Sequence, residues 1–173
     1  WYVQRINTRS SNFSAAFNNR AYVTRKHTQP LNLPTPKEGQ KLVSFFVSSP
    51  FDMANIKEKT MAFDGDQVAI IKALSEIKNI FLVVRIHPNM ENNSDTFCER
   101  LQQQVTAPVK IIAADTKVNS YELIKASDIV VSAGSTVNAE AAFLGKQSVL
   151  CGSAPYARFG ISLVVKDLDT LTS

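Results

Sequence analysis

The stretch of residues 130–150, VVSAGSTVNAEAAFLGKQSVL, decides the fold. It opens with an apolar run that predicts a buried strand, and a Gly-Ser-Thr turn then leads into an alanine-rich segment that predicts a helix. Gly145 is placed to end that helix, and a second apolar run follows. A tight turn into a helix is where α/β proteins often hold an anion. The stretch therefore raises the question of whether residues 134–136 bind a phosphate or only cap a helix.

Strands and helices alternate from residue 41 onward, which is typical of βαβ units. The continuous apolar run FLVVRI, residues 81–86, favours a parallel sheet covered on both faces. The sequence therefore predicts an α/β fold with a Rossmann-like, doubly wound parallel sheet of five or six strands. Strands are predicted at 42–49, 80–88, 109–114, 128–133, 148–152 and 161–165, and helices at 64–79, 94–105, 119–127, 135–145 and from 167.

The chain divides into a leader, residues 1–40, and a folded domain, residues 41–173. Residues 1–41 hold seven basic residues and one acidic residue, a net charge of +6, although the whole chain carries only +4. Pro30, Pro34 and Pro36 exclude a helix there and indicate an extended interdomain linker. A basic leader also suits nucleic acid, a membrane face or acidic glycans, but the charges form no run and a solvated linker is favoured.

The composition is that of a globular domain, with 45% hydrophobic and 20% charged residues. No apolar run approaches the roughly 20 residues that span a bilayer, and no signal peptide pattern opens the chain. We therefore expect a cytoplasmic location, and free thiols at Cys98 and Cys151. The opening WYVQRINTRS has no initiator Met, which we interpret as the middle of a longer protein.

Suggestive residues follow four of the predicted strands, in SSPFD, RIHPN, AADT and AGST. Parallel strands put these ends along one edge of the sheet, where doubly wound folds bind ligands. Small hydroxyls, one His, one Arg and exposed backbone amides suit a phosphate and a ribose. The sequence shows no hydrolytic triad, no metal site and no G-x-G-x-x-G dinucleotide motif, which disfavours a dehydrogenase.

The turn into the predicted helix 135–145 is the first candidate site. We expect Gly134 to allow a sharp turn and a close approach to a ligand. Ser135 or Thr136 is placed to cap the helix, whose first amides point outward. Glu140, about one turn further on, is a candidate for the ribose hydroxyls, although a solvated helix Glu is an equally good interpretation.

His87 and Pro88 end the strand FLVVRI and form the second candidate site. An imidazole at this position can donate a hydrogen bond to a phosphate oxygen. Arg85 has the same strand parity as His87, so both side chains are expected on one face. The alternative for His87 is a local hydrogen bond within the turn. A weaker candidate is the hydroxyl pair Ser48 and Ser49, after the first strand.

RIHPN followed by ASDIVVSAGSTVNAEAAFLGKQSVL resembles the C-terminal nucleotide-sugar domain of GT-B glycosyltransferases. It is most similar to bacterial surface-polysaccharide enzymes of capsule and lipopolysaccharide synthesis, including Kdo- and sialic-acid-transferring families. The resemblance covers about residues 41–165 and implies that His87-Pro88 and Ser135-Thr136 contact the donor nucleotide. The turn also resembles UDP-sugar 2-epimerases, which implies a ribose contact for Glu140.

The resemblance implies a donor-binding half of a GT-B fold that lacks its acceptor half. The expected ligand is a CMP- or UDP-linked sugar as substrate, with no further cofactor. The expected partners are that nucleotide sugar and a glycan acceptor bound by a missing N-terminal domain, with no nucleic acid and a peripheral association with the inner membrane. A UDP-sugar 2-epimerase-like domain and a non-catalytic Rossmann-like scaffold remain the alternatives.

Overall fold

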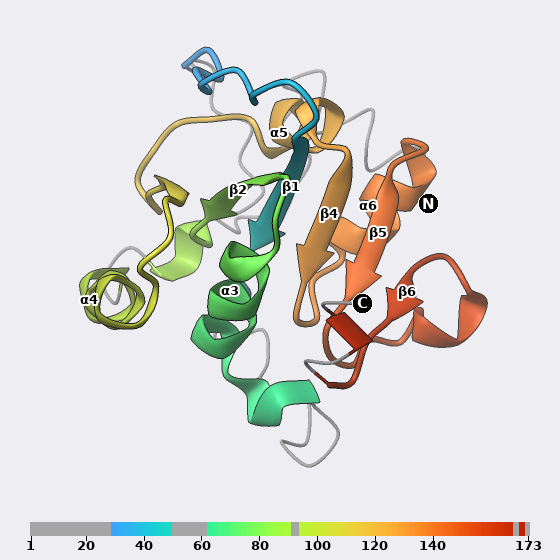
Figure 1. Ribbon diagram of the computed structural model, residues 1–173. Coiled ribbons are helices and arrows are strands. Elements are labelled where there is room, and N and C mark those ends of the chain that lie inside the picture. Colours follow the sequence, from blue (N-terminus) through green and yellow to red (C-terminus); the bar gives the residue numbers. More distant parts are fainter. Residues whose placement is uncertain (1–28, 50–61, 91–93, 168–169, 172–173) are drawn as a thin grey trace.

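A computed structural model describes residues 29–49, 62–90, 94–167 and 170–171 of the chain (Figure 1). Its centre is one six-stranded sheet in the order β3-β2-β1-β4-β5-β6. Every strand pair is parallel, as the apolar strand runs predicted. The strands are β1 (Lys41–Phe46), β2 (Ile80–Arg85), β3 (Lys110–Ile112), β4 (Ile129–Ser132), β5 (Gln147–Leu150) and β6 (Leu163–Val164).

The helices follow the strands in the predicted alternation. The α-helices are α3 (Gln67–Glu76), α4 (Ser94–Gln104), α5 (Ser120–Ala126) and α6 (Val137–Phe143). Short 3₁₀ turns stand at η3 (Ala62–Gly65), η4 (Pro88–Met90) and η5 (Ala157–Phe159). The Rossmann-like fold with helices between parallel strands is confirmed.

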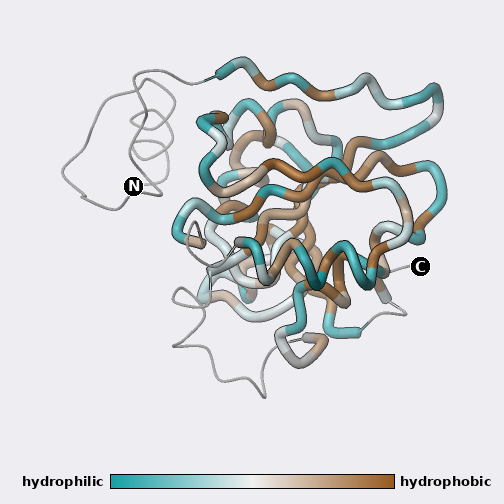
Figure 2. Tube along the Cα trace, turned by 90° about the vertical axis from the view of Figure 1, so that its left-hand side faces the viewer, coloured by the Kyte–Doolittle hydropathy of each residue, from teal (hydrophilic) through white to brown (hydrophobic). Residues whose placement is uncertain are grey.

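Each face of the sheet has its own core. On one face α3 and α4 pack on Val43, Phe45 and neighbouring residues. On the other face α5 and α6 pack on Leu42, Phe46 and their neighbours. Successive β1 side chains point to opposite faces, so the residues from Leu42 to Phe46 are buried and, apart from Ser44, are apolar. Figure 2 shows the hydrophobic stretches of the trace inside the fold and hydrophilic ones around it.

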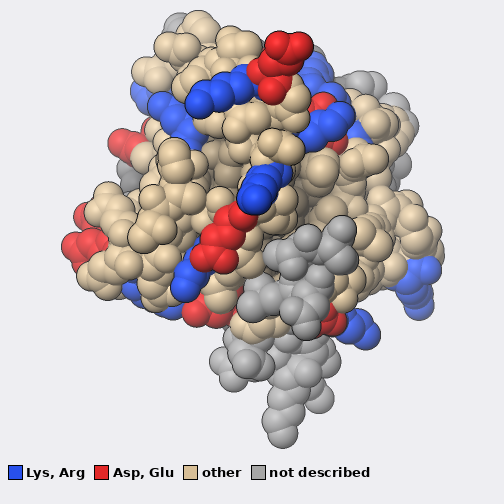
Figure 3. Space-filling model, viewed as in Figure 1, with Lys and Arg blue, Asp and Glu red and all other residues tan. Residues whose placement is uncertain are grey.

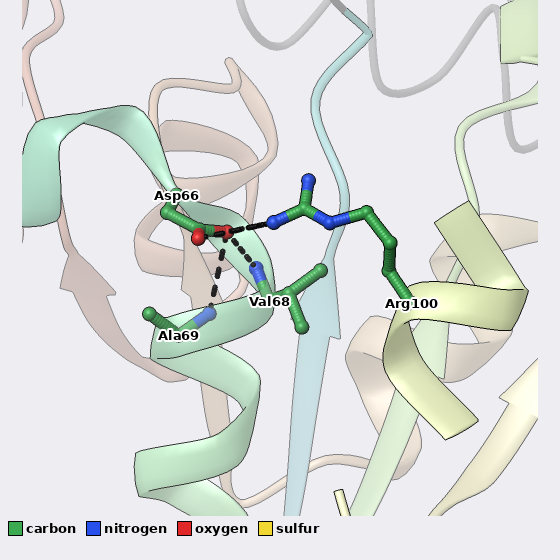
Figure 4. Close-up of polar contacts among 4 residues, drawn as sticks. All are labelled: Asp66, Val68, Ala69 and Arg100. Carbon is green, nitrogen blue, oxygen red and sulfur yellow. Dashed lines mark hydrogen bonds and ion pairs between the residues drawn. The ribbon is translucent and has the colours of Figure 1, made fainter. Parts of the chain in front are cut away.

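Helix α3 is capped at its start by an aspartate side chain. Asp66 is the N-cap, and its Oδ1 accepts hydrogen bonds from the amides of Val68 at 3.0 Å and Ala69 at 3.4 Å. Arg100 of α4 adds an ion pair to the same carboxylate, with Nη2 3.1 Å from Oδ2 (Figure 4). Asp66 therefore joins the two helices that cover one face.

The end of the leader packs on the domain. Gln29 forms a parallel bridge with Val118, and its amide donates to the Lys117 carbonyl at 2.8 Å. Leu31 and Leu33 pack against the core on the α5–α6 face. No helix forms at residues 29–40, in agreement with the prolines, and the contacts of Gln29, Leu31 and Leu33 join this segment to the domain. Residues 1–28 lie outside the described part of the chain.

Candidate functional site at the switch point of the sheet

The carboxyl ends of β1 and β4 lie side by side at the point where the strand order reverses. The chain runs from β1 to β2 and β3 on one side and then returns through α5 to β4 on the other. Phe46, the last residue of β1, is paired with Ser132, the last residue of β4. Doubly wound folds bind ligands in the crevice at this switch point. The fold thus brings the Ser48-Ser49 and Gly134–Thr136 candidates to one place.

The backbone of Ser48 is hydrogen-bonded to a side chain of α3, and the Ser48 hydroxyl is buried. Gln67, the first residue of α3, accepts from the Ser48 amide at 2.8 Å and donates to its carbonyl at 2.9 Å. The Ser48 side chain is 3% exposed, and its Oγ has no hydrogen-bond partner in the described part of the chain. Ser49 is fully buried. Nothing in the sequence pattern had pointed to Gln67, because the contact joins residues 19 positions apart.

The Gly134–Thr136 turn is a helix cap formed by Ser135. Its Oγ accepts from the Val137 amide at 3.3 Å, whereas Thr136 has helical backbone angles and no side-chain cap bond. The Ser135 amide donates to Ser132 Oγ at 3.0 Å, so this amide points into the protein. The φ angle of Gly134 is not left-handed. The hydrogen bond from the Ser135 amide to Ser132 Oγ closes the turn.

A buried polar network behind the turn was missed by sequence reasoning. Asn138 of α6 is fully buried, and its Nδ2 donates to Ser148 Oγ at 2.9 Å and to the Val149 carbonyl at 2.7 Å. Its Oδ1 accepts from Ser132 Oγ. The one signal in the sequence was an Asn among the small residues that put α6 against the sheet. The network ties the turn to β4 and β5.

His87 lies just beyond β2 and is partly exposed. Its Nδ1 accepts from the Asn89 amide at 3.1 Å, which is the local turn bond considered as an alternative. An Nδ1 that accepts a hydrogen bond carries no proton, so the proton of the neutral ring stands on Nε2. Pro88 begins η4 directly after it. The local bond thus orients the imidazole ring at the end of β2.

Arg85 forms structural hydrogen bonds, which were not part of the phosphate contact predicted for it. The side chain is only 4% exposed, and its Nη2 donates to the Thr116 carbonyl at 3.1 Å. Its Nη1 donates to the Ala113 carbonyl. Arg85 therefore ties the end of β2 to the turn after β3. Strand parity predicted the sheet face on which Arg85 lies. It did not predict that the guanidinium group would donate to backbone carbonyls of the turn after β3.

Glu140 lies on the buried side of α6, with 4% of its surface exposed. The interpretation as a solvated helix residue is therefore wrong. A buried carboxylate needs hydrogen-bond partners, because burial of an unpaired charge is costly. Its predicted ribose contact stays a prediction.

The two cysteines of the chain have raised pKa values. Burial raises the pKa of the Cys151 thiol, just beyond β5, to about 12, so this cysteine is no nucleophile. Burial, and secondarily the Asp95 carboxylate, also raise the pKa of Cys98.

On the face seen in Figure 3, basic and acidic side chains are interspersed over the described surface. This mixture agrees with assigning the excess positive charge to the leader.

A protein-family profile with the description "Protein of unknown function (DUF354)" matches residues 63–168, more than half of the chain. The chain belongs to this family. A search among curated proteins gave no significant match. No helix in the described part of the chain is long and apolar enough to cross a membrane.

Two solved structures have a similar fold. One is Thermosulfurimonas dismutans KpsC, beta Kdo 2,4 transferase, with 19% identity over 98% of this chain and 49% of that one, at a TM-score of 0.62. The other is the beta Kdo 2,7 transferase of the same organism's KpsC, with 20% identity over 78% of this chain and 42% of that one, at a TM-score of 0.56. At these identities the likeness concerns the fold, and it confirms the Rossmann-like half of a GT-B architecture. This chain spans half or less of either structure.

Proposed function

We propose that this chain is the donor nucleotide-sugar-binding domain of a GT-B-type glycosyltransferase in bacterial surface-polysaccharide synthesis. The fold shared with two Kdo transferases supports the enzyme class. The acceptor glycan would be bound by another domain, since the chain spans 49% of the longer-matched neighbour. The donor would be CMP- or UDP-linked, and the enzyme would work in the cytoplasm or at the inner face of the membrane, without nucleic acid.

The observation that carries this proposal is the buried hydroxyl of Ser48. It lies at the switch point, two residues beyond the Phe46–Ser132 pair, and has no hydrogen-bond partner among the described residues. A buried polar group without a partner is costly, so such groups in native proteins are commonly completed by water or a ligand. A phosphate oxygen would accept the hydrogen bond that Ser48 leaves unmade.

Each residue around Ser48 would bind a particular part of the nucleotide. The hydroxyls of Ser48, Ser135 and Thr136 would hold the phosphate, with the imidazole of His87 from the β2 side. Glu140 would accept from the ribose hydroxyls. Hydrogen-bond donors placed where negative charge grows on the leaving phosphate stabilise the transition state. These residues would thus serve both binding and departure of the nucleotide.

The test is a comparison of Ser48→Ala with Ser44→Ala. Ser44 lies in β1, four residues before Ser48, and is fully buried, but its Oγ accepts a hydrogen bond from Ser127 Oγ at 2.9 Å. Calorimetry with CMP, UDP, GDP and ADP identifies the nucleotide. Ser48→Ala is then expected to weaken its affinity about tenfold or more, as for a hydrogen bond to a charged group, without loss of stability. Ser44→Ala is expected to cost about 1 kcal/mol of stability and no affinity.

The outcomes separate the alternatives. A chain that binds none of these nucleotides would favour the Rossmann-like scaffold. If Ser48→Ala lowers the melting temperature and leaves every affinity intact, Ser48 is structural and the proposal loses its main support. A UDP-sugar 2-epimerase would bind UDP and interconvert UDP-sugars when joined to its other half.

A further inference from the structure

We infer that Asn138 is a positioning residue that orients the Ser135 peptide through the hydroxyl of Ser132 and so sets the affinity for the phosphate. This inference rests on the proposed function, because it concerns the same nucleotide site. Asn138 would not touch the ligand. It would act through a relay of hydrogen bonds, in which Asn138 orients the Ser132 hydroxyl and Ser132 in turn orients the Ser135 peptide.

The contacts fix the direction of every hydrogen bond in the relay. The Val149 carbonyl can only accept, so the Asn138 atom 2.7 Å away must be Nδ2. Oδ1 therefore faces Ser132, and it can only accept, so the Ser132 hydroxyl must donate to it. The lone pairs of Ser132 Oγ are then directed to the Ser135 amide, 3.0 Å away. The carboxamide of Asn138 thereby turns this amide inward.

The other side of the Ser135 peptide is held as well. The hydroxyl of Tyr156 donates to the Ser135 carbonyl. Because the amide and the carbonyl of Ser135 are both hydrogen-bonded, its backbone orientation is fixed. The Ser135 side chain therefore points in one defined direction. Because Ser135 Oγ already accepts from the Val137 amide, its own hydrogen is the group left to donate. The structure thus assigns phosphate binding in this turn to the Ser135 hydroxyl and not to the Ser135 amide.

Ser148 provides the matched control. Its Oγ accepts from Asn138 Nδ2 at 2.9 Å and donates to the Asn138 carbonyl at 3.1 Å. Ser132 and Ser148 are thus both buried serines bonded to the same Asn. Ser132→Ala breaks the relay, whereas Ser148→Ala loosens Asn138 from β5 and leaves the relay bonds in place. A purely structural network would respond alike to both changes.

The experiment measures affinities of cytidine, CMP, uridine and UDP for the purified chain and both variants. Ser132→Ala is expected to weaken the phosphorylated ligands about tenfold, with nucleosides unchanged, because the Ser135 hydroxyl loses its fixed direction. Ser148→Ala is expected to lower the melting temperature similarly and to change every affinity less than about twofold. The ratio of nucleotide to nucleoside affinity is the readout that stability alone does not move.

Tyr156→Phe tests the same inference if Ser132→Ala fails to fold, because it removes the other bond that fixes the Ser135 peptide. It too is expected to weaken only phosphorylated ligands. Equal losses for nucleosides and nucleotides, or no loss in either relay variant, would overturn the inference while leaving the proposed function standing. A wild-type chain that binds no nucleotide at all would instead remove the proposed function itself.

Discussion

Gly152 lies directly against the backbone of Ala133. A Cβ added to residue 152 would come within 1.8 Å of the Ala133 carbonyl oxygen and 2.9 Å of its carbonyl carbon. The two residues follow the neighbouring strands β5 and β4, and the Cys151 amide donates to the Ser132 carbonyl at 2.8 Å beside them. The backbone before the Gly134 turn thus rests on a glycine of the next strand end.

Gly152→Ala is therefore expected to destabilise the fold by roughly 1–3 kcal/mol or more, because backbone atoms cannot swing away from the added methyl group. Urea unfolding measures the loss. Gly145→Ala is the control, since Gly145 has a φ of +73° and open space around its Cβ position. There only left-handed strain applies, at about 1–2 kcal/mol. A Gly152→Ala protein more stable than Gly145→Ala would contradict the close contact.

Replacing His87 should separate its two hydrogen-bonding positions. His87→Ala is expected to weaken nucleotide binding by about 1.5–3 kcal/mol, as for a hydrogen bond to a charged group. Gln reaches the position of Nε2 and should restore part of the affinity, whereas Asn reaches only the position of Nδ1 and should not. Calorimetry on the three variants decides. Full affinity in folded His87→Ala would remove the residue from the site.

Because Nδ1 accepts from the Asn89 amide, the neutral ring is the expected donor. Affinity should then persist in mildly alkaline solution, where an imidazole is neutral. A steep loss of affinity there, absent in His87→Gln, would show that the charged form binds.

Substitutions in α6 should distinguish phosphate from ribose contacts. Ser135→Ala is expected to cost about 0.5–2 kcal/mol of stability through the lost cap, and in addition to weaken CMP or UDP. Thr136→Ala is expected to weaken the same phosphorylated ligands. Glu140→Gln should weaken nucleosides and nucleotides alike, because it acts on the ribose. If both hydroxyl variants bind every ligand normally, the turn is a cap and nothing more.

Cys151 should make the protein less stable at alkaline pH. Its pKa is about 12 in the folded chain, against about 8.5 for an exposed thiol. Between these values the unfolded state releases the proton and gains free energy, so this contribution is complete below about pH 8.5 and is lost toward pH 12. Urea unfolding between pH 8 and 11 should show a smaller decline for Cys151→Ala than for the wild type. Identical slopes would indicate an accessible thiol.

The sequence by itself determined the elements and their class. Apolar runs such as Phe81–Ile86 and the alternation with amphipathic helices specify buried parallel strands, because burial on both faces demands apolar residues at successive positions. The cap at Asp66 was also local, since it contacts amides two and three residues on. The strand-end rule then places the candidate site at one edge of the sheet.

Only the tertiary structure decided which strand ends are neighbours and what each polar side chain does there. Local patterns do not specify the order β3-β2-β1-β4-β5-β6, which puts the end of β1, before Ser48, beside the end of β4, before the Gly134 turn. The carbonyl partners of Arg85 lie 28 and 31 residues away, so the pattern of its own strand could not indicate them. Hydrogen bonds of Gln67 and Asn138 likewise join segments distant in sequence. A strand or helix is encoded by its own periodicity, but a buried polar contact depends on two segments meeting, and that is settled by packing.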